Sequence, residues 1–302
     1  MTSPRFTSAN GLRFAYIETG QGPLVLMLHG FPDNAETYRT TMDSFAAAGY
    51  HAVAPFLRGY SPTEIPSAGG YDPFTLARDL EGLIRALAPD GKAHVLGMDW
   101  GGTSIQAALA HCPQLIESAI VMNAAHPSTL PRFATDPAQA RSVFHFWFFQ
   151  TDVAEKALAA TDIAMIDYLW RLWSPGYDPG DHLESVRRTL ASPGVLAAAL
   201  QYYGALYRSA QERTFPVGDI AVPTLSIFGA LDPTATYSHL EERYYTGPYR
   251  RIVLDDVGHW PHLESSEAFH RLALEWVSSA SNHSASEATI ADRGRVTDTA
   301  RQ

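Results

Sequence analysis

The chain has 302 residues, enough for one large domain with an insertion or for two modest domains. Its 22 basic residues stand against 32 acidic residues, and the resulting formal net charge of -10 argues against nucleic acid or an anionic membrane as a partner. The single cysteine, Cys112, excludes an intramolecular disulfide and fits a reducing compartment; we expect it to be buried in a helix.

No segment approaches the roughly 18 apolar residues of a membrane span. Residues 1–10 are polar and have neither the basic start nor the apolar run of a secretory signal. The sequence therefore predicts a soluble cytoplasmic protein, monomeric or homodimeric, with no membrane partner.

The first part of the chain alternates predicted strands and helices, a pattern typical of a parallel sheet. The run 24–28 is apolar throughout, as expected for a strand covered on both faces. Pro73 suits the first position of a helix with an apolar stripe. The predicted strands cover 12–19, 24–28, 51–55, 93–97 and 116–122, and the predicted helices cover 35–48, 73–87 and 102–112.

The alternation stops near residue 124. Residues 124–216 are rich in aromatic residues and helix formers and lack a clear buried strand, so we predict an inserted helical cap. Alternation then resumes, with strands over 223–229 and 250–254 and helices over 236–245 and 262–279. The fold class is thus α/β, with a mostly parallel, doubly wound sheet. Residues 1–123 and 217–280 would form the core domain and the polar segment 281–302 a disordered tail.

The stretch 94–103 predicts a strand, a sharp turn and a helix, with Asp99 at the tip. Gly97 and Gly101 stand two places before and after it, where a strained turn needs neighbours without side chains. The familiar form of this turn carries a serine, which forms acyl-enzymes. An aspartate instead attacks a saturated carbon and leaves an alkyl ester that an activated water must hydrolyse. An ordinary glycine turn is the simpler alternative.

Two further groups follow predicted strands, namely Asp232 and His259. With Asp99 they give the chain order nucleophile, acid, histidine, which the α/β-hydrolase arrangement requires. The simpler alternatives are a helix N-cap for Asp232 and a core histidine for His259. His259 and His262 lack a third ligand in a recognisable pattern, so no metal is predicted.

From about residue 12 to 279, cap included, the sequence resembles the α/β-hydrolase superfamily and, within it, the epoxide hydrolases. The resemblance rests on four motifs in order: His29-Gly30-Phe31-Pro32, the elbow at 97–102, Gly229-Ala230-Leu231-Asp232-Pro233, and the segment 258–264 that begins Gly-His-Trp-Pro. It implies that Asp99 attacks an epoxide carbon and that His259, oriented by Asp232, activates the water. It also implies an oxyanion hole made by the backbone N–H groups of Phe31 and Trp100, and no cofactor.

Epoxide hydrolases also use two cap tyrosines as acids for the epoxide oxygen. Tyr203 resembles the second of them, but His145 and Phe146 stand where the first is expected. This departure leaves several possibilities open. His145 donates, or Tyr168 or Tyr202 does, or one tyrosine suffices, or the substrate is not an epoxide.

Trp147 and the phenylalanines after it are expected to form an apolar pocket wall, which favours a small apolar substrate. A haloalkane dehalogenase is the main alternative, since it also combines an aspartate nucleophile with a neighbouring tryptophan such as Trp100. It usually needs a second halide donor, an indole or an asparagine after the first His-Gly. That place is Phe31 here, although Trp147 could offer an indole. A non-catalytic binding protein of the same fold is a further alternative.

Overall fold

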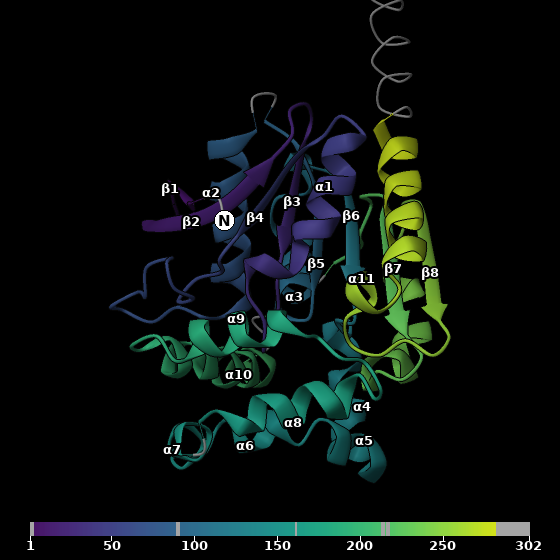
Figure 1. Ribbon diagram of the computed structural model, residues 1–302. Helices are drawn as coiled ribbons and strands as arrows, with labels where there is room; N and C mark the ends of the chain where they lie inside the picture. Colours follow the sequence, from purple (N-terminus) through teal and green to yellow (C-terminus); the bar gives the residue numbers. More distant parts are fainter. Residues whose placement is uncertain (1–2, 89–90, 161, 213–214, 216–217, 282–302) are drawn as a thin grey trace, which may run out of the picture.

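A computed structural model describes residues 3–88, 91–160, 162–212, 215 and 218–281. Within them, one eight-stranded sheet has the order β1-β2-β4-β3-β5-β6-β7-β8 (Figure 1). Strand β2 runs antiparallel to β1 and β4, and the other neighbouring strands are parallel. The strands are β1 Arg5–Ala9, β2 Leu12–Thr19, β3 Leu24–Leu28, β4 His51–Pro55, β5 Ala93–Met98, β6 Ile116–Met122, β7 Thr224–Gly229 and β8 Tyr249–Leu254.

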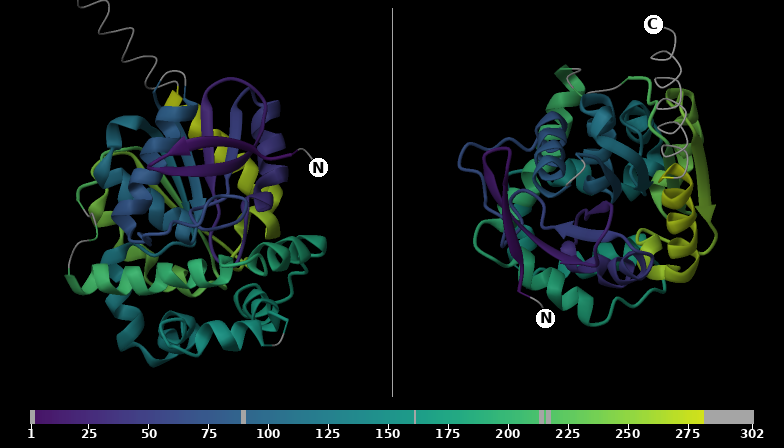
Figure 2. Two further views of the ribbon diagram at one scale, coloured as in Figure 1. Left: turned by 90° about the vertical axis from the view of Figure 1, so that its left-hand side faces the viewer. Right: turned by 90° about the horizontal axis from the view of Figure 1, so that it is seen from above.

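Helices cover both faces of the sheet, as Figure 2 shows. One face carries α1 (Arg39–Ala47) and the helix over 266–281, and the other carries α2 (Pro73–Leu87) and α3 (Trp100–His111). Every residue of β3, β5 and β7 is buried, so these apolar runs lie between two helical layers. Each large apolar side chain buried in this way stabilises the fold by about 1.5–3 kcal/mol. The result is a rigid support for the loops at the carboxyl edge.

A helical cap lies across the carboxyl ends of the parallel strands (Figures 1 and 2). The predicted fold class is confirmed, cap included. Whether the domains divide at 123/124 and 216/217 stays a prediction, and residues 282–302 of the expected tail lie outside the described residues. The cap helices are α4 Leu130–Thr135, α5 Pro137–Ser142, α6 His145–Phe148, α7 Ala154–Ala159, α8 Ala164–Trp173, α9 Asp181–Leu190 and α10 Val195–Glu212.

Four elements differ from the sequence-based expectation. The edge strand β1 was not predicted because its side chains are largely exposed, but Asn10-Gly11 joins it to β2 with positive φ angles at both residues, a common hairpin turn. The helix expected over 236–245 is a pair of 3₁₀ helices, Pro233–Leu240 and Glu242–Tyr244. It begins early because Asp232 caps it and Pro233 takes the first position.

The last predicted helix is divided as well, into α11 (Pro261–Glu264) and the helix over 266–281. At the start of the domain, the helix expected over 35–48 is likewise a 3₁₀ turn, Ala35–Tyr38, followed by α1. Cys112 is buried and lies at the C-terminal end of α3, one residue beyond the helix. None of the helices in the described ranges combines the length and apolar character needed to cross a bilayer.

Candidate active site

Asp99 occupies the turn between β5 and α3. Its backbone has φ 49° and ψ −115°, a conformation that costs a non-glycine residue about 1–3 kcal/mol. The flanking glycines leave room for this turn. A Cβ atom on Gly101 would lie 2.0 Å from the carbonyl oxygen of Leu28, and one on Gly97 would lie 2.7 Å from the carbonyl carbon of Gly101. The strained turn therefore depends on both glycines and presents the carboxylate at the edge of the sheet.

The Asp99 carboxylate accepts backbone hydrogen bonds from two sides. The N–H of Phe31 donates to Oδ1 over 2.8 Å, and the N–H of Trp100 donates as well. Burial raises the pKa of the Asp99 carboxyl, while the charge of His259 and the two N–H groups oppose the shift. Phe31 and Trp100 thus stand where the sequence places an oxyanion hole.

His259 and Asp232 form a buried pair. Nδ1 of His259 donates to Oδ2 of Asp232 over 2.5 Å, while Oδ1 of Asp232 accepts the N–H of Thr234 over 2.8 Å. Asp232 is therefore both a helix cap and the partner of the histidine. Burial lowers the pKa of His259, but the charges of Asp232 and Asp99 outweigh this effect and raise it above the usual value. Nε2 of His259 is buried without a hydrogen-bond partner among the described residues.

The cap contacts the histidine loop directly. The N–H of His259 lies 2.9 Å from Oγ of Ser174 and 3.1 Å from the carbonyl oxygen of Trp173, both at the end of α8. Oγ of Ser174 in turn donates to the carboxylate of Glu264 over 2.6 Å. The loop that carries the candidate base is thus bonded to the cap as well as to the core.

Two side chains that the sequence analysis did not single out brace the same loop. The Glu264 carboxylate accepts the N–H groups of Gly258 and Trp260, over 2.7 and 2.8 Å. The Asn123 amide donates to the carbonyl oxygens of Gly258 and His259, over 2.9 and 3.0 Å. Asn123 directly follows the buried strand β6, and this place at the carboxyl edge was the signal that could have found it.

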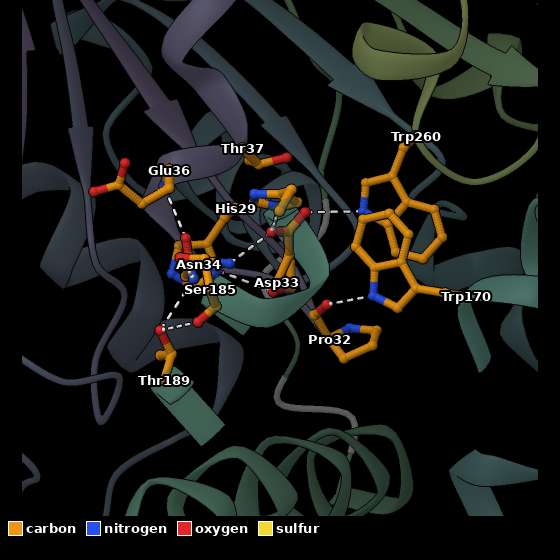
Figure 3. A network of polar contacts seen from close by, with 12 residues as sticks. His29, Pro32, Asp33, Asn34, Glu36, Thr37, Trp170, Ser185, Thr189 and Trp260 are labelled. Atoms are coloured by element: carbon orange, nitrogen blue, oxygen red, sulfur yellow. Dashed lines mark hydrogen bonds and ion pairs between the residues drawn. The ribbon is translucent and has the colours of Figure 1, made fainter. Parts of the chain in front are cut away.

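A buried carboxylate, Asp33, joins the loop after β3 to the cap (Figure 3). Its oxygens accept the indole N–H of Trp260 over 2.8 Å and a ring N–H of His182, on α9, over 2.7 Å. The indole of Trp170, on α8, stacks on Trp260 with centroids 3.4 Å apart and donates to the carbonyl oxygen of Pro32. The charge of Asp33 outweighs burial and raises the pKa of His182. These contacts hold α8 and α9 over the triad.

Two cap side chains face the catalytic end of the core. The rings of Tyr203, on α10, and His145, on α6, are both buried, with centroids 5.5 Å apart. Neither the Tyr203 hydroxyl nor Nδ1 of His145 has a hydrogen bond of regular geometry among the described residues. The indole N–H of Trp100 also lacks one, although it lies close enough to the Tyr203 hydroxyl to lower the pKa of that group in part. The two rings are 5.2 Å apart between centroids.

The protonation of these two side chains follows from their surroundings. Burial and the charge of Asp99 raise the pKa of Tyr203 well above its usual value. Burial and the charge of His259 lower the pKa of His145 well below its usual value. At neutral pH both side chains are therefore uncharged, and each carries a proton that it can donate.

The other cap residues considered lie elsewhere. The hydroxyl of Tyr202 donates to the carbonyl oxygen of Arg58 over 2.7 Å, and Tyr168 is 48% exposed on α8. Trp147 is 41% exposed and lines an apolar cavity that Asp99 does not line. Within the described ranges, no group of three or more His, Cys, Asp or Glu side chains could hold a metal ion. Of the cap candidates, Tyr203 and His145 are therefore the two brought to the triad.

A carboxylate at a strand-to-helix elbow, a histidine-acid pair on later strands and a helical cap define the class of protein. Residues 23–266 match the family model of the alpha/beta hydrolase fold, and the chain belongs to this family.

Individual relatives carry epoxide hydrolase names, which confirms the resemblance. "Epoxide hydrolase 3" of Xenopus tropicalis is 29% identical over 289 residues, covering 89% of this chain and 75% of the relative. "Epoxide hydrolase A" of Mycobacterium tuberculosis is 29% identical over 300 residues, covering 85% and 91%. The crystal structure of a Bacillus megaterium epoxide hydrolase with an inhibitor has a TM-score of 0.81 at 24% identity, covering 91% of this chain and all (100%) of that one. The last likeness concerns the fold.

Proposed function

We propose that the protein is a cofactor-free epoxide hydrolase that converts an apolar epoxide into a vicinal diol through an alkyl ester on Asp99. One observation carries the proposal. Two buried, uncharged donors of the cap lie at the triad: Tyr203 is close enough to Asp99, and His145 close enough to His259, for those charges to shift their pKa values. Neither the Tyr203 hydroxyl nor Nδ1 of His145 has a regular partner among the described residues. A nucleophile opposite two free donors matches a reaction in which a carbon is attacked while its oxygen leaves. A cytoplasmic location stays a prediction.

In the first step, the carboxylate oxygen of Asp99 that Phe31 does not hold attacks an epoxide carbon. The carbon–oxygen bond of the ring breaks, and the oxygen accepts hydrogen bonds from Tyr203 and His145. A phenol is a much stronger acid than an alcohol, so the proton of Tyr203 passes to the alkoxide. The products are a hydroxyalkyl ester on Asp99 and a tyrosinate.

In the second step, Nε2 of His259 removes a proton from water, and the hydroxide adds to the ester carbonyl. The N–H groups of Phe31 and Trp100 stabilise the oxyanion, each donor contributing about 2.7–4 kcal/mol. The diol leaves with the proton of the new carboxyl group, and the imidazolium returns its proton to Tyr203. Ester formation removes the charge of Asp99, one of the groups that raise the pKa of His259, so the histidine becomes available as a base when it is needed.

The dehalogenase alternative has one observation in its favour: the indole N–H of Trp100 has no hydrogen bond of regular geometry among the described residues. A second donor is missing from the nucleophile, because Trp147 is 41% exposed and lines the apolar cavity that Asp99 does not line, and Phe31 stands where an asparagine would donate. A protein that only binds ligands would have no need of the bonded pair of His259 and Asp232. We therefore propose hydrolysis of epoxides ahead of both alternatives.

The test is the intact mass of a His259→Gln variant after incubation with an aryl epoxide and, separately, with a bromoalkane. Removing the base should block the second step and trap the ester. We expect an adduct of the whole epoxide mass on the peptide that contains Asp99. An alkyl adduct from the bromoalkane alone would replace the proposal by the dehalogenase.

Two controls make the result specific. The Asp99→Ala/His259→Gln double variant should form no adduct, since the nucleophile is gone. His262→Gln removes a buried histidine three residues away that bonds Thr37 over 2.8 Å, and it should turn over epoxide without accumulating ester. An adduct that persists without Asp99 would show that another residue is the nucleophile.

A further inference from the structure

Two cavities adjoin beneath the cap. The inner one, of about 40 Å³, is lined by Asp99 and Trp100, and the outer one, of about 490 Å³, is lined by Tyr203 and reaches Trp147 and Tyr207. Trp147 and Tyr207 are 41% and 43% exposed, so the outer cavity opens at the cap surface. A substrate therefore reaches the nucleophile through the outer cavity.

Some residues line both cavities, and we call the boundary that they form the neck. They come from the segment after β6, from α4, α6 and α10, and from the segment after α10. The six neck residues are Pro127, Leu130, Phe133, Phe146, Leu206 and Phe215.

The two cavities differ greatly in size, so they can hold only substrate parts of unequal size. An inner cavity of about 40 Å³ has room for roughly three water-sized groups, about the three heavy atoms of an oxirane ring. The outer cavity is more than ten times as large. One substituent on the ring can extend through the neck, whereas a second substituent on the far carbon would have no space.

The outer cavity also restricts the polarity of that substituent. The polar side-chain groups of its described lining are those of Ser128, Gln150 and Ser209, the indole N–H of Trp147 and the two tyrosine hydroxyls. None of its described lining residues carries a charge. An ionised group placed there would lose its hydration without gaining a partner. The substituent must therefore be neutral and largely apolar.

We propose that the substrates are terminal epoxides that carry one large, uncharged, apolar substituent. This inference rests on the proposed epoxide hydrolase function. The ring enters first, so its unsubstituted carbon lies deepest, next to Asp99, and its oxygen stays on the side of Tyr203. Asp99 attacks the CH₂ carbon, the CH₂–O bond breaks, and the oxygen keeps its bond to the substituted carbon and takes a proton from Tyr203. Water then hydrolyses the ester, and the configuration of the substituted carbon is retained.

The test compares three matched substrates on the whole protein. They are 1,2-epoxy-4-phenylbutane, its disubstituted analogue trans-3,4-epoxy-1-phenylhexane, which carries an ethyl group on the far carbon, and the para-carboxylate of the first. We expect kcat/KM for the first to exceed that for each of the other two by at least ~100-fold, as poorly fitting methylenes and unpaired charges typically cost. Repeated turnover of the first in ¹⁸O-water should place the label on the terminal carbon.

Widening the neck gives an independent check. Leu206→Ala should raise the ratio of kcat/KM for the disubstituted epoxide to kcat/KM for the terminal epoxide at least ~10-fold. Leu200→Ala is the matched control, because Leu200 lies on the same helix with the same 8% exposure but lines neither cavity. If Leu206→Ala does not fold, Phe133→Leu widens the same neck from α4.

The outcomes separate this inference from the function on which it rests. Equal turnover of the disubstituted epoxide or of the carboxylate, or label on the substituted carbon, would overturn the inference and leave an epoxide hydrolase. No turnover of any of the three, with no ester trapped in His259→Gln, would overturn the proposed function and the inference with it.

Discussion

The two halves of the site are built differently. In the core half, Asp99, Asp232 and His259 follow strands and are each held by hydrogen bonds within the protein. In the cap half, Tyr203 and His145 lie on helices, and their polar atoms lack a regular partner among the described residues. A group with a protein partner is fixed before a substrate arrives, whereas a buried donor without one is left for the ligand. Under the proposed mechanism, the core therefore holds the nucleophile and the base in place, whereas the cap supplies an acid that is free to bind the ligand.

Removal of the nucleophile should lower epoxide turnover the most. Asp99→Ala should lower epoxide turnover by at least ~10⁴-fold, comparable to the loss of other enzymatic nucleophiles. Steady-state hydrolysis of 1,2-epoxy-4-phenylbutane measures the effect, with circular dichroism to verify folding. A variant that keeps full activity would end the assignment of Asp99.

Neutralising the acid of the histidine pair should separate the two chemical steps. Asp232→Asn can still cap Thr234 but cannot orient and stabilise a charged His259, so turnover should fall by about 10³–10⁴-fold. Ester formation should remain fast. One equivalent of the hydroxyalkyl ester per enzyme should therefore accumulate in the first turnover and be detected as a mass adduct. Equal loss in both steps would mean that Asp232 supports the fold of the site and not the base alone.

Removing the cap donors one at a time tests whether each of them acts as an acid. Tyr203→Phe and His145→Phe should each slow single-turnover ester formation by about 10²-fold or more, because each removes a donor to the leaving oxygen. His145→Tyr should keep most of the wild-type rate, because the phenol of a tyrosine can donate in place of the imidazole. Tyr202→Phe is the neighbouring control, since its hydroxyl serves Arg58. An unchanged rate in His145→Phe would leave Tyr203 as the sole acid.

Glu241 is a buried carboxyl outside the site. It can show whether a polar atom without a regular partner marks a functional group or results only from burial. Glu241 has one oxygen bonded to Tyr249 and one without a regular partner among the described residues, and burial raises its pKa to about 7. Its contribution to stability is full below the usual glutamate pKa and is lost as the pH rises through about 7.

We therefore expect Glu241→Gln to stabilise the protein at pH 8 by about 3 kcal/mol relative to the wild type, with little difference at pH 4.5. Chemical unfolding at the two pH values measures this difference, and catalytic rates should not change. A loss of turnover without a change in stability would place Glu241 among the functional groups.

The contrast between the halves also explains what the sequence could predict. Asp99 was found because the strained turn demands Gly97 and Gly101 at fixed spacing, and Asp232 and His259 because strands of a parallel sheet end at one edge. His145 remained one of several possibilities, because the cap helices pack through aromatic contacts that no short sequence motif marks.

The braces of the histidine loop were harder to predict for the same reason. Asn123 and Ser174 bind backbone groups of His259 that lie 136 and 85 residues away in the sequence, and only the folded chain brings them together. Glu264 binds backbone N–H groups six and four residues before it, but nothing in that short segment marks the contact. The capped helix at Asp72 and Pro73, by contrast, is specified within a few residues and was placed correctly.

The bond between the cap and the histidine loop has a consequence for recombination between relatives. The N–H of His259 binds Trp173 and Ser174 at the end of α8, and Ser174 in turn binds Glu264. A chimera that receives a foreign cap would lose these contacts unless the donor supplied a hydroxyl at the same place. In this protein the cap should therefore be exchanged only together with the histidine loop that it touches, and a library of cap grafts should keep the two as one inherited block.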